Sequence, residues 1–365
     1  MPLVSQHILQ AQQSFGASVA AEKIPTWHAC KNIQYPQRLS LEQCSSEWTA
    51  RYKATLVSGS TLVDLTGGMG VDCSFLSDAF AQTTYVEQST QLCQLAQNNF
   101  SALHKTIRVI NDTCEHYLLD MPTVDVIFID PARRDQKGGK MVGLASCSPN
   151  LLEIGALLLQ KCQTLLIKLS PMIDIDSVVN VFPTTTAIHI VSVKNECKEV
   201  LLKVESQPTA PTEPVLHCIN LLPGQSTYTP FCFTRAQERS CTVSYAAPLT
   251  YLYEPNASIL KAGAFKQVAV HYGVQKLHPN SHLYTSTTLA ADFPGKIFSI
   301  ERITKVQRKE ITDIEKGNLV IRNFPGSVAD LRKKLKLKDG GDTHIFATTL
   351  CDDSKVLIVG RRVGS

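Results

Sequence analysis

Several common signatures are missing from this chain of 365 residues. Its 12 cysteines include no Cys-x-x-Cys pair. This absence argues against a zinc ribbon and against a disulfide framework, so most of the thiols are expected to be reduced and buried. No apolar run approaches the about 20 residues of a membrane span, and residues 1–24 hold no signal-like apolar segment. We therefore expect a cytoplasmic protein with no membrane partner.

The chain also lacks a strong overall charge and a metal-ligand set. Its formal net charge is only +4, with 19% charged and 44% hydrophobic residues, as in an ordinary globular protein. His278 and His282 have the spacing of two ligands on a helix, but Pro279 and Asn280 between them oppose a helix. We predict no metal site, while the length is sufficient for two or three domains.

The run at residues 62–72, LVDLTGGMGVD, is the most informative feature that is present. It reads as an apolar strand carrying Asp64, followed by Gly67, Gly68 and Gly70. Glycines let a backbone turn sharply and approach a ligand where a Cβ would collide, and a following helix offers free N–H groups. The pattern indicates a nucleotide-like cofactor site, although paired glycines also mark ordinary strand-to-helix turns.

Three more predicted strands end in acidic residues, and they occupy residues 83–86, 107–110 and 124–129. Glu87, Asp112 and Asp130 follow them in that order. The last strand is almost continuously apolar, which is typical of a strand covered on both faces. Because the carboxyl ends of parallel strands meet at one edge, these acids and Asp64 are expected along the edge where open α/β folds bind ligands.

The alternation of helices and strands continues with a helix at 149–161, a strand at 164–169 and a hairpin at 187–193 and 199–204. This order predicts an α/β fold built on a parallel sheet. Lys168 stands inside an apolar strand, where a lysine is rarely buried without a partner. We leave two roles open for it: an inward ion pair with a carboxylate, or contact with substrate.

Over residues 55–205 the chain resembles the class I S-adenosylmethionine-dependent methyltransferases. The resemblance implies a Rossmann-like, seven-stranded sheet that binds S-adenosylmethionine (SAM), and the cofactor-binding positions fall on Asp64, Gly67, Gly68, Gly70, Glu87, Asp112 and Asp130. The glycine loop would surround the methionine part, Glu87 the ribose and Asp112 the adenine amine. A nicotinamide-binding domain fits less well, because Gly-x-Gly-x-x-Gly is absent and Asp64 would repel a diphosphate.

The sequence Asp-Pro-Ala-Arg that begins at Asp130 resembles the Asp-Pro-Pro-x motif of enzymes that methylate nitrogens of nucleic-acid bases. The resemblance implies that Asp130 and the Pro131 backbone orient the acceptor for direct in-line transfer, with Arg133 as a third catalytic candidate. The chain departs from the motif at Ala132 and at Arg133, where an aromatic residue would stack on a base. Arg133 and Arg134 could hold a phosphate instead. Alternatively, Asp130 only positions the cofactor and both arginines are solvated.

A second motif, Ser146-Cys147-Ser148-Pro149, resembles the Ser-Cys-Asn-Pro element of uracil-C5 methyltransferases, whose cysteine attacks the ring. In those enzymes the element follows the fifth strand. Here it precedes a predicted helix that starts at Pro149 with Ser148 as its N-cap. We therefore favour a helix-entry role for Cys147 over a nucleophilic one.

Basic residues gather toward the C-terminus, after a segment at 246–294 in which aromatic and basic side chains alternate. The densest basic run lies on a predicted helix that begins near Ser327, and its candidate RNA contacts are Arg332, Lys333, Lys334 and Lys336. Such runs suit sequence-independent phosphate binding, and interleaved aromatics suit base stacking. The alternative is a solvated face beside core aromatics.

The C-terminal part resembles the THUMP-like module of a bacterial methyltransferase group that shares the runs Asp-Leu-Thr-Gly-Gly-Met-Gly and Asp-Pro-Ala-Arg-Arg-Asp. This resemblance implies four parts: a helical N-terminal region (1–50), a SAM-binding methyltransferase domain (51–207), an α+β ferredoxin-like intermediate domain (208–294) and a basic THUMP-like domain (295–365). True THUMP domains bind RNA, so tRNA or rRNA is the implied partner and substrate, by domain association alone. The alternatives are methylation of a protein or small molecule, and a SAM-binding RNA-interaction protein without transfer activity.

Overall fold

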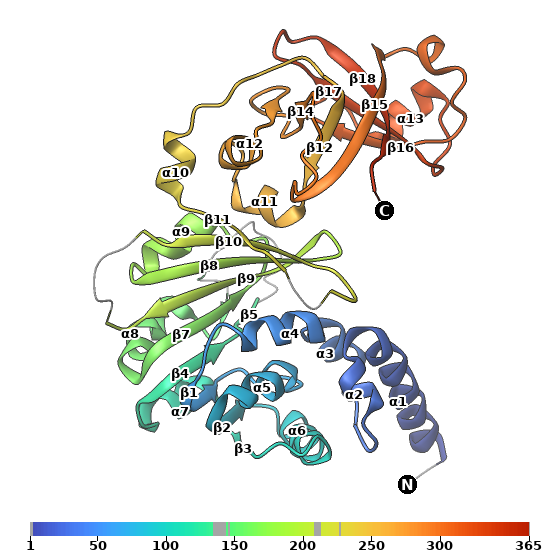
Figure 1. The fold of residues 1–365 in the computed structure, drawn as a ribbon. Helices are drawn as coiled ribbons and strands as arrows, with labels where there is room; N and C mark the ends of the chain where they lie inside the picture. The colour runs from blue at the N-terminus through green and yellow to red at the C-terminus, as the bar shows by residue number, and fades with distance from the viewer. Residues whose placement is uncertain (1–2, 134–143, 145–146, 208–212, 226–227, 365) are drawn as a thin grey trace. The chain divides into compact units, whose positions relative to one another are not determined.

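The computed structural model describes residues 3–133, 144, 147–207, 213–225 and 228–364. They form two compact units. The first unit comprises Met1–Val215 with Leu221–Tyr228, and the second comprises Leu216–Asn220 with Thr229–Ser365. Figure 1 shows the helices and strands of each unit. Among the described residues, none of the helices is both long and apolar enough to cross a membrane.

Helices open the first unit, and their bounds are α1 Leu3–Lys23, α2 Pro25–Ala29, α3 Arg38–Gln43 and α4 Glu47–Ala54. They share one apolar cluster with the glycine run, because Trp27 and Leu41 pack in the same core as Met69 and Val71. Burial of these side chains is what holds the N-terminal helices against the sheet domain. The start of the chain is therefore attached to the segment that the sequence marks as the cofactor loop.

The sheet of the first unit has the predicted Rossmann-like form. Seven of its strands are β1 Gly59–Asp64, β2 Phe80–Glu87, β3 Ile107–Asn111, β4 Val124–Ile129, β7 Cys162–Leu169, β8 Thr185–Val193 and β9 Glu196–Glu205. They lie in the order β8-β9-β7-β4-β1-β2-β3. The five strands from β3 to β7 run parallel, and β9 is antiparallel to β7 and β8. The predicted α/β fold is confirmed, and these seven strands are part of a nine-stranded sheet.

Short helices and bridges connect these strands: α5 Val71–Leu76, η1 Ser77–Ala79, α6 Thr90–Ala102, α7 Cys114–Asp120, β5 Ala132–Arg133, β6 Cys147–Ser148, α8 Leu151–Lys161 and α9 Ile175–Val181. The predicted helix start at Pro149 is wrong by two residues. Asn150 caps α8 in place of Ser148, because its side chain accepts a hydrogen bond from the Leu152 N–H at 3.1 Å.

The predicted hairpin is the β8–β9 pair. Its turn lies at Lys194 and Asn195, whose φ angles are 51° and 65°. Two successive residues in the left-handed region give the turn twist that matches two antiparallel strands. The register of β8 on β9 carries the buried Glu199 opposite Val191.

The second unit is an α+β structure with its own cores. Its elements are β10 Val215–Leu221, β11 Phe231–Phe233, α10 Arg235–Ser240, β12 Tyr251–Pro255, α11 Ala257–Ala262, α12 Gln267–Tyr272, β13 Gln275–Lys276, β14 Tyr284–Ser286, β15 Gly295–Lys305, η3 Arg308–Ile311, β16 Asn318–Arg322, α13 Val328–Leu335, β17 Thr343–Thr349 and β18 Lys355–Arg362. Seven of the strands form a sheet in the order β13-β14-β12-β15-β18-β17-β16.

Some of the aromatic and basic residues of segment 246–294 belong to the core. Tyr253 and Tyr284 are fully buried, and Lys276 is 3% exposed. The Lys276 ammonium lies 5.6 Å from the Phe265 ring centre and 5.9 Å from that of Tyr284, a cation–π arrangement inside the domain. The rings of Tyr253 and Tyr284 are therefore core residues and offer no surface for stacking bases.

Candidate active site

A cavity of about 450 Å³ opens at the carboxyl edge of the first unit's sheet. It is lined by the glycine loop after β1, by the ends of β2, β4 and β7, by the start of α7, and by residues 40 and 43–45 of the N-terminal region. Its volume is typical of a small-molecule or cofactor site. Among the described residues, its walls carry one ammonium group, Lys168, and five carboxylates, which belong to Asp64, Asp72, Glu87, Glu115 and Asp130. Such a site favours a ligand that carries positive charge.

Close packing explains why the loop after β1 needs glycines. A Cβ on Gly67 would lie 2.1 Å from the Tyr85 ring, and one on Gly70 would lie 2.8 Å from the Phe100 ring. Gly70 also has a φ of 88°, in the left-handed region, where it precedes α5. The Tyr85 hydroxyl donates a hydrogen bond to the Gly68 carbonyl at 2.6 Å. The buried rings thus hold the loop in one conformation at the cavity wall.

Asp64 is the most deeply buried of the four predicted acidic cofactor contacts. It is 1% exposed, and its carboxylate accepts a hydrogen bond from the Thr66 N–H at 3.0 Å. Burial raises the pKa of Asp64 well above the usual range for a carboxyl, and the nearby carboxylates of Asp72, Asp130 and Glu87 add to this shift. A cationic ligand group at this place would favour the ionised form.

Glu87 is fixed by two backbone N–H groups. Its two oxygens accept hydrogen bonds from Gly68 at 2.9 Å and from Ser89 at 2.8 Å. Each carboxylate oxygen can accept a second hydrogen bond, so both ribose hydroxyls remain within the capacity of this group. The ribose role of Glu87 stays a prediction, as does the methionine role of the glycine loop.

Asp112 lies outside the cavity. Cys114 and Glu115 line that wall, whereas Asp112 is absent from it. Its carboxylate instead pairs with the His116 ring at 2.7 Å, and this hydrogen bond lowers the pKa of Asp112. The position of Asp112 therefore does not support the expected contact with an adenine amine. Asp112 does follow β3, as predicted.

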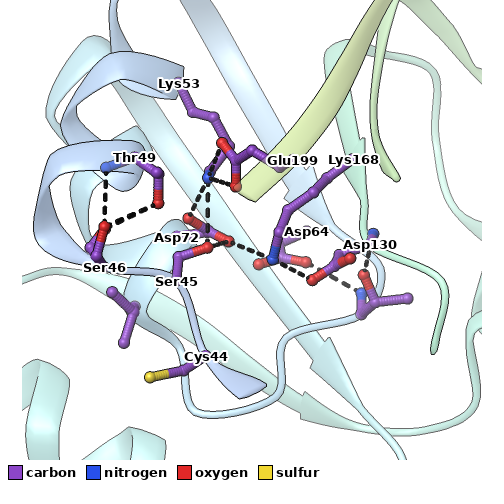
Figure 2. A network of polar contacts seen from close by, with 12 residues as sticks. Cys44, Ser45, Ser46, Thr49, Lys53, Asp64, Asp72, Asp130, Lys168 and Glu199 are labelled. Carbon is purple, nitrogen blue, oxygen red and sulfur yellow. Dashed lines mark hydrogen bonds and ion pairs between the residues drawn. The ribbon is translucent and has the colours of Figure 1, made fainter. Parts of the chain in front are cut away.

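Asp130 and Lys168 form the centre of the site (Figure 2). The Lys168 ammonium lies 2.5 Å from Asp130 Oδ2 and 3.5 Å from Asp72 Oδ2. Burial alone would lower the pKa of Lys168, but the carboxylates of Asp130, Asp72 and Glu199 together raise it above its ordinary value. Of the two roles left open for Lys168, the inward ion pair is the one observed. Its side chain, which is 12% exposed, also lines the cavity.

The ion pair continues into a buried network that the sequence did not reveal (Figure 2). The fully buried Lys53 of α4 contacts Glu199 at 2.7 and 2.8 Å and Asp72 at 3.2 Å. Ser45 donates a hydrogen bond to Asp72 at 2.7 Å. Burial alone would raise the pKa of Asp72, but Lys53 and Lys168 lower it. The sequence contains one sign of this network, because Glu199 is a charged residue directly before an apolar run.

The remaining predicted residues of the first unit lie after β4 and before α8. Pro131 is buried beside Asp130, and Ala132 lines the cavity. The Arg133 backbone pairs with Cys147, while the side chain of Arg133 and the whole of Arg134 lie outside the described residues. Cys147 is 5% exposed and does not line the cavity, which agrees with a structural role rather than a nucleophilic one.

The basic run of the second unit is divided by its local structure. Lys336 does not lie on the predicted helix, because α13 ends at Leu335 and Lys336 follows it with a φ of 50°. Arg332 pairs with Asp339 at 2.7 Å. Lys333 and Lys334 are exposed, and Lys334 lines a groove of about 800 Å³ together with Lys305 and Lys355. Within the part of the chain that the structure describes, no cluster of metal-ligating side chains was found.

Comparison with known proteins places this geometry in a family. A family model described as a ferredoxin-like domain matches residues 251–294, and one described as THUMP domain-like matches residues 295–362. A solved structure from Porphyromonas gingivalis W83, provisionally named a methyltransferase, is 36% identical in sequence, with a TM-score of 0.89. The match covers 97% of this chain and 90% of that one. This chain belongs to the class I SAM-dependent methyltransferases of the bacterial THUMP-like-domain group.

Other solved structures are similar over less than half of this chain. An rRNA methylase from Streptococcus thermophilus is 16% identical, with a TM-score of 0.31, covering 43% of this chain and 93% of its own. The M. capricolum protein TrmK, solved with S-adenosylhomocysteine, is 11% identical, with a TM-score of 0.35, covering 44% of this chain and 68% of its own. Likenesses this distant carry no argument about substrate. A search of curated proteins gave no match.

Proposed function

We propose that this protein binds SAM in the 450 Å³ cavity and transfers its methyl group to a nitrogen of structured RNA, either tRNA or rRNA. The residues present fit that cofactor. Asp64 offers a buried carboxylate to an ammonium group, Glu87 has hydrogen-bonding capacity for a ribose, and the glycine loop forms one wall of the cavity. When bound, SAM supplies a methyl group on an electrophilic sulfonium, so an acceptor nitrogen needs chiefly a lone pair directed at it.

The observation that carries the catalytic proposal is the position of Asp130. The Lys168 ammonium donates a hydrogen bond to Oδ2 of the Asp130 carboxylate at 2.5 Å. The Asp130 backbone N–H donates a hydrogen bond to the Thr66 hydroxyl at 2.6 Å. The described residues give the other oxygen, Oδ1, no hydrogen-bond partner. Oδ1 is therefore the atom that accepts the acceptor's N–H, orients the nitrogen and takes up the proton that the nitrogen loses.

The RNA part of the proposal rests on the second unit. Its residues 295–362 match a THUMP domain-like model, and true THUMP domains bind RNA. Lys333 and Lys334 are exposed on α13, and the groove beside Lys334 is also lined by Lys305 and Lys355. Ammonium groups arranged this way suit contacts with the phosphate backbone of any sequence. The adjacent Arg332 is engaged by Asp339 and contributes less.

The proposal is tested with labelled SAM and the purified full chain. Separate tRNA, rRNA, protein and small-metabolite fractions are taken from cells that lack this protein, and methyl incorporation is measured in each. Label confined to RNA is the expected result. Label in protein or metabolites would remove the RNA assignment, and the absence of label despite measurable SAM binding would point to a binding protein without transfer activity.

Two variants at Asp130 separate orientation from binding. Asp130→Asn and Asp130→Ala should reduce the transfer rate about 100-fold, the size typical of a misdirected reacting group. Their affinity for S-adenosylhomocysteine should stay within a factor of a few of the wild type. Asp120→Asn, on an exposed residue, is the matched control and should change neither quantity. Full activity in Asp130→Ala would show that this carboxylate does not orient the acceptor.

A further inference from the structure

A second cavity, of about 710 Å³, adjoins the cofactor cavity on the side of the N-terminal helices. The two share four lining residues, which are Gln43, Cys44, Ser45 and Lys168. The other walls come from α1, from the start of α4 with Trp48, and from the β8–β9 hairpin. Figure 2 shows the Lys168 ammonium between Asp72 and Asp130, with Ser45 beside Asp72. A ligand in the second cavity would therefore meet the same lysine that holds Asp130.

The charges that line this second cavity are balanced. Among the residues that the structure describes, four lysines (Lys23, Lys168, Lys194 and Lys198) are matched by four glutamates (Glu22, Glu42, Glu196 and Glu199). The inner pair is already compensated, because Lys168 binds Asp130 and Glu199 binds Lys53. Balanced walls with many donors and acceptors suit a neutral polar ring better than a polyanion. Trp48 adds an aromatic face, on which any base can stack.

The mouth of the cavity has a different character. Lys194 pairs with Glu22 at 3.1 Å and Lys198 pairs with Glu196 at 2.7 Å, and the two glutamate side chains are 83% and 73% exposed. Exposed pairs of this kind contribute little stability. A phosphate could therefore take the place of either glutamate beside its lysine at small cost. The hairpin thus offers two ammonium groups at the entrance to a neutral interior.

We propose that the second cavity receives one nucleotide of the RNA acceptor, with its base on the Trp48 indole and its phosphates at Lys194 and Lys198. The reacting edge of the base is directed past Lys168 into the cofactor cavity, which Asp130 lines. This inference rests on the proposed function and adds the acceptor pocket to it. Donor and acceptor must occupy adjoining cavities for a direct transfer, and a base that has left its stack needs an aromatic surface to replace the lost stacking. The second cavity meets both requirements.

Tryptophan fluorescence gives a direct test that does not depend on catalysis. The chain has two tryptophans, of which Trp27 is 1% exposed and Trp48 lines the cavity. With S-adenosylhomocysteine present, at least one of the four nucleoside 5′-monophosphates should quench the wild type. It should not quench Trp48→Phe. Lys198→Gln should weaken binding of the monophosphate several-fold but leave the affinity for the corresponding nucleoside unchanged. Lys203→Gln, on the same strand, should change neither affinity. Failure of every nucleotide to quench the wild type would overturn the pocket.

Kinetics with RNA provide the second test. Trp48→Ala should raise KM for RNA about tenfold, the size of one lost base–aromatic stack, and Trp48→Phe should restore most of this. Unchanged affinity for S-adenosylhomocysteine shows that both variants are folded. If the wild type methylates RNA and Trp48→Ala has the same KM and kcat, the acceptor pocket is wrong while the proposed function stands. If the wild type labels no RNA, the proposed function fails, and nucleotide quenching then decides separately whether the cavity binds nucleotides.

Discussion

Replacement of Lys53 by methionine should destabilise the first unit strongly. The Lys53 side chain is 0% exposed and that of Glu199 is 3% exposed, with the two charges 2.7 Å apart. Removal of the ammonium leaves Glu199 buried without a cation, while Asp72 keeps only the more distant Lys168 at 3.5 Å. Breaking a buried ion pair from one side costs about 3–5 kcal/mol. We expect the free energy of unfolding of Lys53→Met to fall by about that amount.

Urea unfolding followed by tryptophan fluorescence measures this loss, because both tryptophans lie in the first unit. Lys53→Met/Glu199→Gln should recover at least half of it, since the uncompensated charge is gone. The deficit should also shrink as the pH falls. Burial raises the pKa of Glu199 in the folded state. At low pH Glu199 is protonated, and the neutral carboxyl needs no cation beside it. This contribution to folding stability is lost as the pH rises through the folded-state pKa of Glu199.

A surface lysine provides the control for this prediction. Lys194 pairs with Glu22 through side chains that are 58% and 83% exposed, so Lys194→Met should change the free energy of unfolding by about 1 kcal/mol or less. If Lys53→Met were as stable as Lys194→Met, the network would not be holding buried ionised groups, and the account of how α4 is joined to the sheet would be refuted.

Three further predictions concern ligands. Gly67→Ala should weaken SAM binding about tenfold in calorimetry, because its Cβ would collide with the buried Tyr85. The affinity of the wild type for SAM should fall as pH drops through the raised pKa of Asp64, because the protonated carboxyl no longer attracts an ammonium group; Asp64→Asn should bind weakly at all pH values. Lys333→Gln with Lys334→Gln should reduce the salt slope of RNA binding by about 2.

Each of these has a matched comparison. Gly224→Ala, at a glycine with nothing within 4 Å of an added Cβ, should leave SAM affinity unchanged. A pH-independent wild-type affinity would mean that Asp64 does not meet a cationic group. Arg332→Gln should alter the salt slope less than the double lysine variant, because Asp339 already engages this arginine. Equal effects would show that the exposed lysines have no special part in RNA binding.

The sequence alone determined the core of the fold and the edge that carries the site. Buried parallel strands need long apolar runs, so β4 and β7 were visible, and chain order placed the acids that follow the strands at one edge. Asp64, Glu87 and Asp130 line the cavity there. Gly67 and Gly70 were visible too, because close approach of a ring or a left-handed φ requires glycine.

Only the tertiary structure decided which charges meet. Lys53 and Glu199 are 146 residues apart in the chain, and no local pattern records such a pairing. It also turned Lys168 toward Asp130, which lies on a different strand end. Local periodicity reports which face of an element is buried. The partner of a buried charge depends on how distant elements pack, and that packing formed the second cavity beside Trp48.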